Sequence, residues 1–228
     1  MRIAEIYASR QGEGLLTGTP SVFVRASGCN LRCGFCDTPF TSWAPEGEDL
    51  SVTEIIDECL ALGLEHVVIT GGEPMLFAEL MPLTQMLRKL KRHITIETAG
   101  TLSLSVDCDL MSISPKLSNS TPELPRAGQW QARHERDRFR PDVIRDLLER
   151  YEYQLKFVVA APADLKEIGE YVLAFPELEP SRVLLMPEGI DQARLAEIGK
   201  WLEPKCAELG FRFCPRMHIE WYGNQRGK

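Results

Sequence analysis

The sequence predicts an α/β fold in which parallel strands alternate with crossover helices. Short apolar runs rich in β-branched residues alternate along the chain with longer stretches whose apolar residues recur at helical spacing. A chain of 228 residues that is 44% hydrophobic can bury one full core. About six βα units fit a partial or full β/α barrel or an open doubly wound sheet, and periodicity does not choose between them. In either fold the chemistry belongs at the carboxyl ends of the strands.

The expected strands are short and mostly apolar. Ser21–Arg25 is the first of them, and it leads directly into a cysteine-rich loop. His66–Thr70 is rich in β-branched residues, which is typical of a buried strand. The remaining strands are expected over residues 94–96, 110–113, 155–159, 183–186 and 211–213.

Four helices are predicted from their start and stop signals. Ser51 and Glu54 have the spacing of a capping box, and the apolar face that follows ends at Gly63. Residues 77–92 carry leucines at helical spacing and basic residues in the last turn, as the helix dipole favours. The other two helices are expected to begin at Pro162 and at Asp191, the second ending before Gly210.

Residues 118–140 interrupt this pattern. The stretch is polar, contains two prolines and a glycine, and mixes five arginines with acidic residues, so it suits a core poorly. An irregular segment of this length is usually either a functional lid or partly disordered, and both interpretations stay open. We therefore expect residues 1–228 to form one domain with a polar insertion at about 118–140.

Composition and charge limit the classes of partner. The chain has 26 Lys and Arg against 33 Asp and Glu, a net charge of −7, which argues against a broad basic surface for nucleic acid. A small anionic substrate held by local arginines remains compatible with this charge. The start of the chain does not resemble a signal peptide, and no apolar run approaches the ~18 residues of a membrane span. We expect a cytoplasmic protein with no nucleic-acid or membrane partner.

Three of the seven cysteines give the strongest chemical signal. Cys29, Cys33 and Cys36 have the spacing C-x3-C-x2-C, which lets one loop turn three thiolates toward a soft metal centre. A 4Fe-4S cluster with three thiolate ligands leaves one iron open for another molecule to coordinate. The number of cysteines therefore favours an iron–sulfur cluster.

Zinc is the alternative at this loop. A structural zinc site is closed by four protein ligands, so a fourth would have to come from elsewhere, such as Cys59, Cys108 or His66. Nothing in the spacing nominates one of them. The cysteines outside the loop are more simply core or incidental thiols. They are Cys59, Cys108, Cys206 and Cys214.

A glycine turn, Gly71-Gly72-Glu73-Pro74, follows the second predicted strand. Glycines let backbone carbonyls approach an amine closely, and the carboxylate of Glu73 can balance a cation. Alone, the motif could equally be a plain strand-to-helix turn with Pro74 at the first helical position. After the cysteine loop, in this order, it resembles the radical S-adenosylmethionine superfamily. The resemblance implies that the three thiols hold three irons of a 4Fe-4S cluster and that S-adenosylmethionine chelates the fourth.

Further motifs narrow this resemblance. They are Gln11-Gly12-Glu13-Gly14, the phrase Cys33-Gly34-Phe35-Cys36-Asp37-Thr38, Glu97-Thr98, Ser114-Pro115-Lys116, and the tail from His218 to Gly227. Together they resemble the 7-carboxy-7-deazaguanine synthase family. The resemblance runs from residue 5 to the C-terminus and is weakest across 118–140.

The family resemblance implies a shortened, variable β/α barrel of the TIM type. It implies conversion of 6-carboxy-5,6,7,8-tetrahydropterin to 7-carboxy-7-deazaguanine with release of ammonia, on the route to queuosine and related 7-deazapurines. It also implies a magnesium-dependent homodimer and an external one-electron donor such as flavodoxin. In such enzymes the cofactor carries the radical chemistry, and the protein binds and orients.

The resemblance also assigns residues to the substrate and to magnesium. Arg25 would bind the substrate carboxylate, to which a guanidinium offers two parallel hydrogen bonds. Glu13 and the backbone around Gly14 would read the pterin edge. Thr38 would be the protein ligand of Mg²⁺, which prefers hard oxygen. The other residues expected at the substrate are Gln11, Thr70 and His218.

Residues from several loops would bind S-adenosylmethionine. Glu97, Ser114 and Lys116 would contact its ribose and carboxylate, and Phe35 would lie near the adenine. The members of the glycine turn expected to receive its amine are Gly71, Gly72 and Glu73.

These residues also have ordinary structural interpretations. A strand arginine such as Arg25 is usually a surface residue, a threonine such as Thr38 often caps a turn, and a histidine such as His218, expected on a strand, is often structural. Glu97 could be a partly exposed strand end. Arg216 departs from the uncharged residue that the family pattern would accept there.

Two other classes of protein share part of the pattern. Another radical S-adenosylmethionine enzyme, such as a glycyl-radical activating enzyme, would need a protein partner and would have less use for residues 11–14. An iron–sulfur electron carrier or sensor would not need residues 71–74. Because residues 11–14 and residues 71–74 both carry their motifs, we favour the synthase family.

Overall fold

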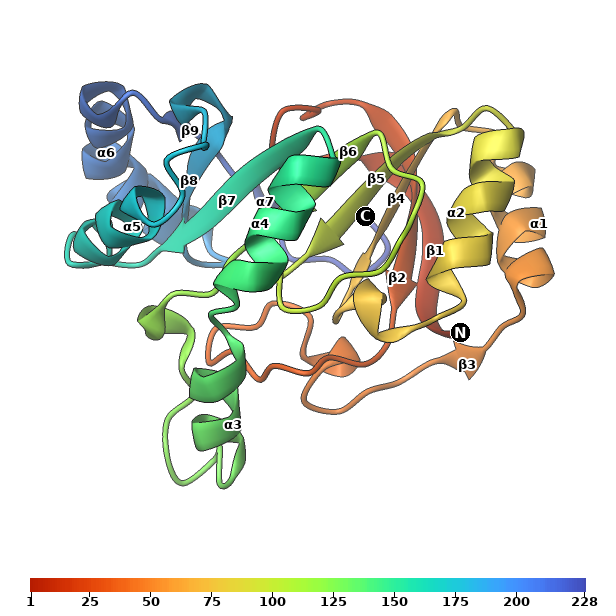
Figure 1. The fold of residues 1–228 in the computed structure, drawn as a ribbon, viewed down its shortest axis with the longest axis horizontal. Coiled ribbons are helices and arrows are strands. Elements are labelled where there is room, and N and C mark those ends of the chain that lie inside the picture. Colours follow the sequence, from red (N-terminus) through yellow and green to blue (C-terminus); the bar gives the residue numbers. More distant parts are fainter.

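The computed structural model describes all 228 residues, and its strands form one nine-stranded sheet (Figure 1). The strand order is β3-β1-β2-β4-β5-β6-β7-β8-β9. Neighbours from β2 to β9 are parallel, whereas β1 and β3 are antiparallel to their neighbours. The bounds are β1 (Arg2–Arg10), β2 (Pro20–Ala26), β3 (Glu48–Asp49), β4 (His66–Gly71), β5 (His93–Thr98), β6 (Leu110–Ile113), β7 (Tyr153–Val159), β8 (Val183–Pro187) and β9 (Arg212–Phe213).

The strand order decides between the two predicted architectures. From β2 onward each crossover leads to the next place in the same direction, whereas a doubly wound sheet reverses at a switch point. The sheet is curved, and β3 and β9 stand at its two ends without pairing to each other (Figure 1). The fold is therefore a partial β/α barrel, as predicted.

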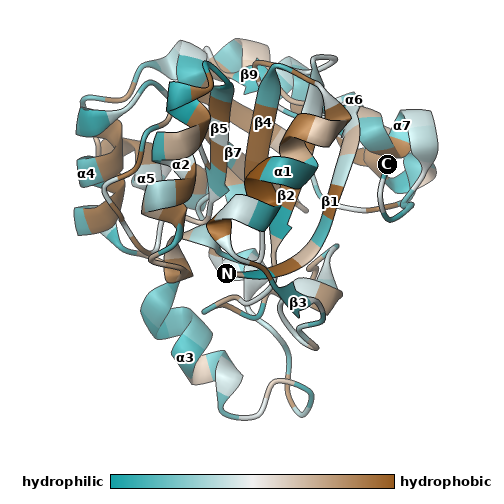
Figure 2. Cartoon of the chain, turned by 90° about the vertical axis from the view of Figure 1, so that its right-hand side faces the viewer, coloured by the Kyte–Doolittle hydropathy of each residue, from teal (hydrophilic) through white to brown (hydrophobic).

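The crossover helices cover the outer face of this sheet (Figure 1, Figure 2). The first of them begins with the predicted capping box, in which the Glu54 amide donates to Ser51 Oγ over 3.2 Å, and it ends at Gly63 with φ of 71°. The helix bounds are α1 (Val52–Leu62), α2 (Leu80–Lys89), α4 (Pro141–Arg150), α5 (Asp164–Leu173) and α6 (Gln192–Leu209). Two further helices, α3 (Trp130–Asp137) and α7 (Met217–Tyr222), lie outside the βα repeat.

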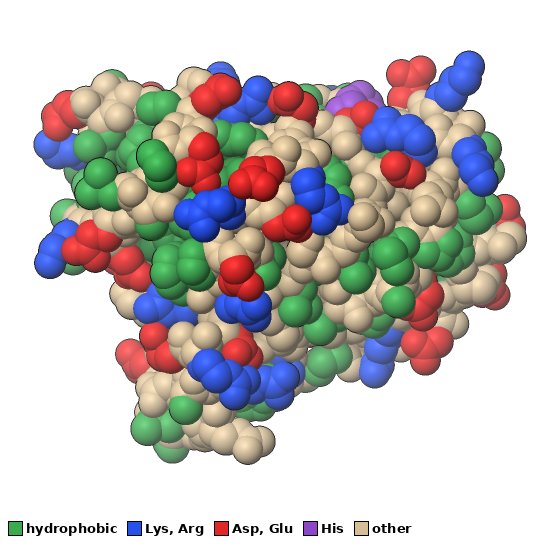
Figure 3. Space-filling view, viewed as in Figure 1, with side chains coloured by type: hydrophobic (Ala, Val, Ile, Leu, Met, Phe, Trp, Pro, Cys, Tyr) green, Lys and Arg blue, Asp and Glu red, His purple; other side chains and the backbone are tan.

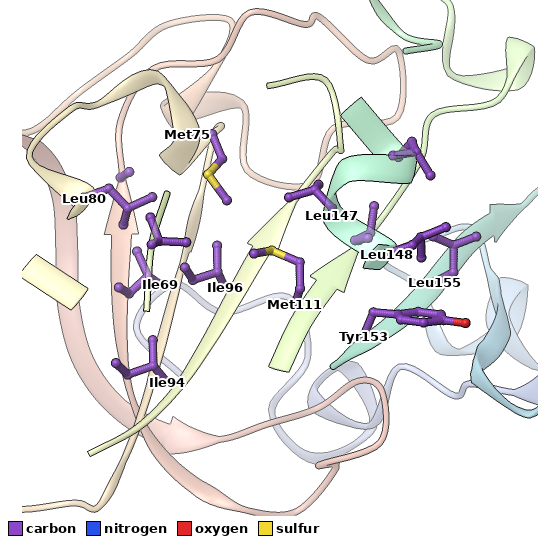
Figure 4. Packing of buried hydrophobic residues seen from close by; sticks show 14 of the residues in the cluster. Ile69, Met75, Leu80, Ile94, Ile96, Met111, Leu147, Leu148, Tyr153 and Leu155 are labelled. Carbon is purple, nitrogen blue, oxygen red and sulfur yellow. The ribbon is translucent and has the colours of Figure 1, made fainter. Parts of the chain in front are cut away.

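The core lies between the outer helices and the sheet (Figure 4). In β7, Leu155 and Phe157 are fully buried in this core, while Gln154 and Lys156 alternate with them and face the inside of the barrel. The same period of two places Met111 and Ile113 of β6 in the core and Ser112 on the other face, whereas both faces of β8 are apolar. Cys59 and Cys206 lie in the core and Cys214 in a smaller apolar cluster, as expected of structural thiols.

Several sequence expectations need correction. No strand was expected before residue 20, and no helix was expected at α4. The helix expected over residues 77–92 begins later, at Leu80, because the 3₁₀ turn Pro74–Leu76 and the residues after it precede α2. The helix expected from Pro162 begins two residues later, and His218 lies on α7 rather than on a strand.

None of the helices combines the length and the apolar composition that a membrane span requires.

Residues 118–140 were wrongly expected to suit a core poorly throughout. They contain α3 and four buried residues, Ser120, Pro122, Ala127 and His134. His134 bonds to Ser120 within the segment and to the Arg32 amide of the cysteine loop, which is far away in the sequence, so no local pattern predicts this contact.

Candidate active site

A cavity of about 530 Å³ lies at the carboxyl ends of the parallel strands. This volume suits one or two small ligands, and the edge of the sheet is where β/α folds gather their functional loops. Most of the residues predicted for the site line it: Gln11, Glu13, Arg25, Cys29, Cys33, Phe35, Cys36, Thr38, Thr70, Gly71, Gly72, Glu97, Ser114, Lys116 and His218. Gly14 and Glu73 do not.

The cysteine loop follows β2 and brings all three thiols to the cavity. The Leu31 amide approaches Cys29 Sγ at 3.4 Å, and Trp43 Nε1 donates to the Cys33 carbonyl over 3.0 Å. Burial raises the pKa of the Cys29 and Cys33 thiols to about 12, because a buried thiolate is poorly solvated. A metal cation supplies the charge that makes such thiols ligands, so the donor set suits a cationic centre.

The glycine turn holds the cysteine loop as well as lining the cavity. A Cβ on Gly71 would lie 2.1 Å from the Ala26 carbonyl oxygen, and one on Gly72 would lie 2.0 Å from that of Gly28. The Gly72 amide donates to Ala26 over 3.0 Å, so the backbones pass in close contact. Only glycine leaves room for this approach.

Glu73 is fully buried and acts within the protein. Its carboxylate accepts from Thr98 Oγ1 at 2.8 Å, from the Ala99 amide at 2.9 Å and from the Met75 amide at 3.1 Å. Burial raises the pKa of Glu73 in spite of these bonds. The side chain therefore ties the glycine turn to the end of β5, and its carboxylate does not line the cavity.

A chain of ion pairs, in which two buried cations meet three half-buried carboxylates, lies along the cavity. Lys156 Nζ lies 2.9 Å from Glu13 Oε2 and 3.0 Å from Glu97 Oε1. Arg216 Nε donates to Glu13 Oε1 over 3.1 Å, and another nitrogen of the same guanidinium pairs with Asp37. The chain links the segment before β2, strands β5 and β7, the cysteine loop and the tail.

These contacts set the protonation of the cavity. Burial alone would raise the pKa of Glu13, but Lys156 and Arg216 outweigh it and lower that pKa. Burial opposes the charge of Lys156 too, and Glu97 and Glu13 nevertheless raise its pKa. His218, whose Nδ1 lies 3.9 Å from Glu13, has its pKa lowered by burial. At neutral pH the cavity therefore holds an ionised Glu13 and a protonated Lys156 beside a neutral imidazole.

Arg25 lies on β2 with two of its three nitrogens engaged. Its Nε donates to Glu5 Oε1 over 2.7 Å and its Nη2 donates to the Tyr7 hydroxyl over 2.7 Å. Nη1 has no protein acceptor within hydrogen-bond distance, so the guanidinium is held in place at the cavity with one nitrogen unengaged. On β4, Thr70 Oγ1 donates to Glu97 Oε2 over 2.7 Å.

The remaining predicted residues occupy the rim. Lys116 Nζ donates to the carbonyl and hydroxyl oxygens of Ser114, over 2.8 and 2.7 Å, just beyond β6. Thr38 Oγ1 is 3.4 Å from the hydroxyl of Thr41, and Gln11 donates to Ser21 Oγ over 3.0 Å. Gly14 has φ of 79° and packs where a Cβ would collide with Gln154, so it shapes the wall behind the cavity.

Sequence analysis missed two charged members of the site. Lys156 sits in the middle of an apolar strand, and a lysine between two buried positions is itself a signal, because such a charge needs partners. Arg216 was noted only as a departure, but it lines the cavity and bonds to Glu13. Glu5, Tyr7 and Asp37 were not assigned roles, and they line the same space.

Comparison with known proteins places this geometry in a family. A model of the radical SAM superfamily matches residues 23–116. The chain is 44% identical over 226 residues to 7-carboxy-7-deazaguanine synthase of Rhodopirellula baltica, covering 99% of this chain and 88% of that protein. It is 43% identical to the synthase of Halobacterium salinarum, covering 95% and 88%. The chain belongs to the 7-carboxy-7-deazaguanine synthase family.

Solved structures agree with this family assignment. The crystal structure of QueE from Escherichia coli matches with a TM-score of 0.65 and 25% identity, covering 95% of this chain and 94% of that one. Streptococcus suis SuiB matches with a TM-score of 0.59 and 14% identity, over 87% of this chain and 49% of that one, and it shows the fold alone. As a member of the synthase family the chain is a radical SAM enzyme, and this superfamily implies a 4Fe-4S cluster and S-adenosylmethionine.

Proposed function

We propose that this enzyme converts 6-carboxy-5,6,7,8-tetrahydropterin to 7-carboxy-7-deazaguanine with release of ammonia, in a Mg²⁺-dependent reaction that serves queuosine and related 7-deazapurines. The observation that carries the proposal is the identity of 44% and 43%, over nearly the whole chain, to two proteins named 7-carboxy-7-deazaguanine synthase. The chemistry of the cavity supports it, because the cysteine loop, the glycine turn, Arg25 and Glu13 line one space. Such a space brings cofactor and substrate within contact distance of each other.

The donor set fits a cluster better than a zinc ion. Cys29, Cys33 and Cys36 all line the cavity, and soft thiolates are the ligands of iron–sulfur centres. No three Cys, His, Asp or Glu side chains converge on a single point as a mononuclear site requires. When bound, the cluster and S-adenosylmethionine would supply one-electron cleavage of a carbon–sulfur bond and removal of hydrogen from the substrate.

The substrate would lie between Arg25 and Glu13. The free Nη1 of Arg25 would donate to the pterin carboxylate, and Glu5 and Tyr7 would hold the guanidinium while it does so. Glu13 would accept from the ring N–H and amino groups, since an ionised carboxylate offers about four acceptor sites and its protein partners use only part of them. The remaining substrate contacts would come from Gln11, the backbone at Gly14, Thr70 and His218.

Lys156 would keep Glu13 in the state that binds substrate. Its ammonium lies between Glu13 and Glu97, and its positive charge lowers the pKa of Glu13. Without that cation, Arg216 would be the remaining strong partner that favours the ionised form of Glu13 against burial. Lys156 thus contacts both Glu13, the proposed substrate ligand, and Glu97, a proposed ligand of S-adenosylmethionine.

S-adenosylmethionine would be bound across the ends of β4, β5 and β6. Glu97 would contact the ribose, Ser114 and Lys116 the ribose or carboxylate, and Phe35 the adenine, while Gly71 and Gly72 offer backbone to the amine. Glu73 would act indirectly, by holding the turn in place through Thr98 and Ala99. Thr38 would give Mg²⁺ its protein oxygen ligand.

The proposal includes two partners outside the chain. A second copy would form a homodimer, and an external one-electron donor such as flavodoxin would reduce the cluster. Both follow from the family resemblance, and both are tested separately from the reaction, by light scattering and by replacing a chemical reductant with the protein donor.

Anaerobic turnover tests the proposed reaction. The reconstituted full chain would be incubated with 6-carboxytetrahydropterin, S-adenosylmethionine, Mg²⁺ and a reductant, and the products separated by mass. We expect 7-carboxy-7-deazaguanine to accumulate over many turnovers. Cleavage of S-adenosylmethionine that leaves the pterin unchanged would keep the superfamily and eliminate this substrate.

A further inference from the structure

The polar segment 118–140 lies against the cysteine loop. In Figure 1, α3 projects beneath the sheet, beside the loop that follows β2. Figure 3 shows basic and acidic side chains together on this projection, and several of them form ion pairs, such as Arg138 with Glu135. The buried contacts of the segment, rather than its surface charge, connect it to the cysteine loop.

His134 of α3 is fully buried and joins a directed chain of hydrogen bonds. The Arg32 amide, inside the cysteine loop, donates to His134 Nδ1 over 3.2 Å. Because Nδ1 accepts, Nε2 carries the ring proton, and it lies 2.9 Å from Ser120 Oγ. Ser120 Oγ donates in turn to the Leu117 carbonyl over 2.6 Å. Burial lowers the pKa of His134 to about 4, which agrees with the neutral ring that this geometry requires.

Two further contacts hold the same loop. The Gly34 amide donates to the Ser120 carbonyl over 2.9 Å. The guanidinium of Arg32 lies 3.9 Å from the centre of the Trp130 ring, and its Nη1 donates to the Cys29 carbonyl over 2.6 Å. The segment thus contacts the loop both between Cys29 and Cys33, at Arg32, and between Cys33 and Cys36, at Gly34. The contacts use two backbone amides and the stacked side chain of Arg32.

We propose that residues 118–134 form a clamp that holds the cysteine loop in its cluster-binding conformation, with His134 as its positioning residue. The inference rests on the proposed iron–sulfur cluster but not on the proposed substrate. Ordering a free loop costs about 1–2 kcal/mol for each residue, so a loop that is already ordered retains its cluster better.

The clamp also controls the surroundings of the cluster sulfurs. It directs the amides of Arg32 and Gly34 to His134 and Ser120, and it covers the loop with Trp130. Hydrogen bonds to sulfur and exposure to water both set the potential of such clusters. A reduced cluster carries more negative charge than an oxidised one, so added amides or water stabilise the reduced form. Loss of the clamp should therefore make the potential less negative.

Two substitutions at His134 separate positioning from folding. His134→Leu fills the site but offers no acceptor to the Arg32 amide, whereas His134→Asn places an amide oxygen near the position of Nδ1. Arg136→Leu is the matched control, since this exposed α3 side chain pairs only with Asp137. Each full-length variant would be reconstituted anaerobically, and three quantities measured: iron release to a ferrous chelator, cluster potential by redox titration, and hydrogen exchange.

We expect His134→Leu to release iron about tenfold faster than the wild type, as loss of one buried hydrogen bond predicts, and to show a less negative potential. Exchange should rise in residues 29–36 while the strand amides stay protected. His134→Asn and Arg136→Leu should resemble the wild type in all three measurements.

Three results would overturn the clamp. The first is a His134→Leu variant with wild-type iron release and potential, and the second is a His134→Asn variant as defective as His134→Leu. The third is faster exchange throughout the sheet of His134→Leu, which would make His134 a general stability residue. A wild-type chain that binds no iron would overturn the proposed function together with this inference, so the two failures are distinguishable.

Discussion

The two faces of the sheet differ in chemistry although alternate residues of the same strands build them. In β7, Leu155 and Phe157 are buried against the outer helices, while Lys156 is almost equally buried on the cavity side, at 3% exposure. On the helix side stability comes from removing apolar surface from water. On the cavity side a buried charge is tolerated only while its partners remain. Burial alone therefore does not distinguish core from site, and the partners do.

The comparison predicts its largest effect on the helix side. Phe157→Ala should lower the free energy of unfolding by about 3–5 kcal/mol, because it leaves a cavity in a closely packed core. Urea unfolding of the cluster-free protein measures this. Leu173→Ala, at a side chain that is 83% exposed, is the control and should change stability little. A Phe157→Ala variant as stable as this control would contradict the assignment of that face to the core.

The neighbouring cavity-side residue should affect activity more than stability. Lys156→Met keeps the length of the side chain but removes the cation between Glu13 and Glu97, so we expect turnover to fall about 100-fold. Unfolding should cost about 1–3 kcal/mol less than in the wild type. Lys166→Met on α5, an exposed residue, is the matched control. Equal losses of stability in Lys156→Met and Phe157→Ala with unchanged turnover would show that both faces serve only the core.

Thr38 tests whether the rim of the cavity binds metal. If its hydroxyl is a ligand of Mg²⁺, Thr38→Ala should raise the Mg²⁺ concentration needed for half-maximal activity by about tenfold, as loss of one contact worth about 1.4 kcal/mol implies. Iron content should stay the same. Thr53→Ala, at an exposed residue of α1 outside the cavity, is the comparison and should leave the Mg²⁺ dependence unchanged. Identical Mg²⁺ dependence in the wild type and Thr38→Ala would remove the assignment.

The smallest expected effect is a difference in acid stability. Because the pKa of Glu13 is lowered in the folded state, its ionised form contributes stability that is complete above the ordinary glutamate value of 4.5 and is lost as the pH falls below it. Glu13→Gln should therefore flatten the loss of stability between pH 5 and more acid conditions. Chemical unfolding of cluster-free protein at a series of pH values measures the slope. Parallel curves for both proteins would show that Glu13 is not stabilised as a carboxylate.

Local signals predicted the elements that local interactions build. Ser51, Glu54 and Gly63 mark α1 because a capping box and a left-handed cap involve residues only a few positions apart. The three cysteines and the glycine turn were recognised for the same reason, as short motifs. The helix α4 was overlooked although Pro141 at its start and the helical spacing of its apolar residues are local signals of the same kind. By contrast, the contact of His134 with Arg32, 102 positions earlier, has no local signal.

The site shows the same division at the level of single residues. Glu73 was predicted at the cavity from its motif, but its carboxylate is used by Thr98 and Ala99, which only the pairing of β4 with β5 brings near. Arg216 was unexplained until the tail was seen to return to Glu13 and Asp37. The direction of a side chain and the identity of its distant partners are properties of the assembled sheet.

The sequence by itself determined the class of fold, the metal-binding loop, the glycine turn and the family, because each is written in residue types at short, regular spacing. Tertiary structure alone decided that Lys156 and Arg216 belong to the site and that residues 118–134 contact the cysteine loop. The physical reason is that these features arise from contacts between residues far apart in the chain, whose free energy depends on a geometry that exists only once the strands have assembled.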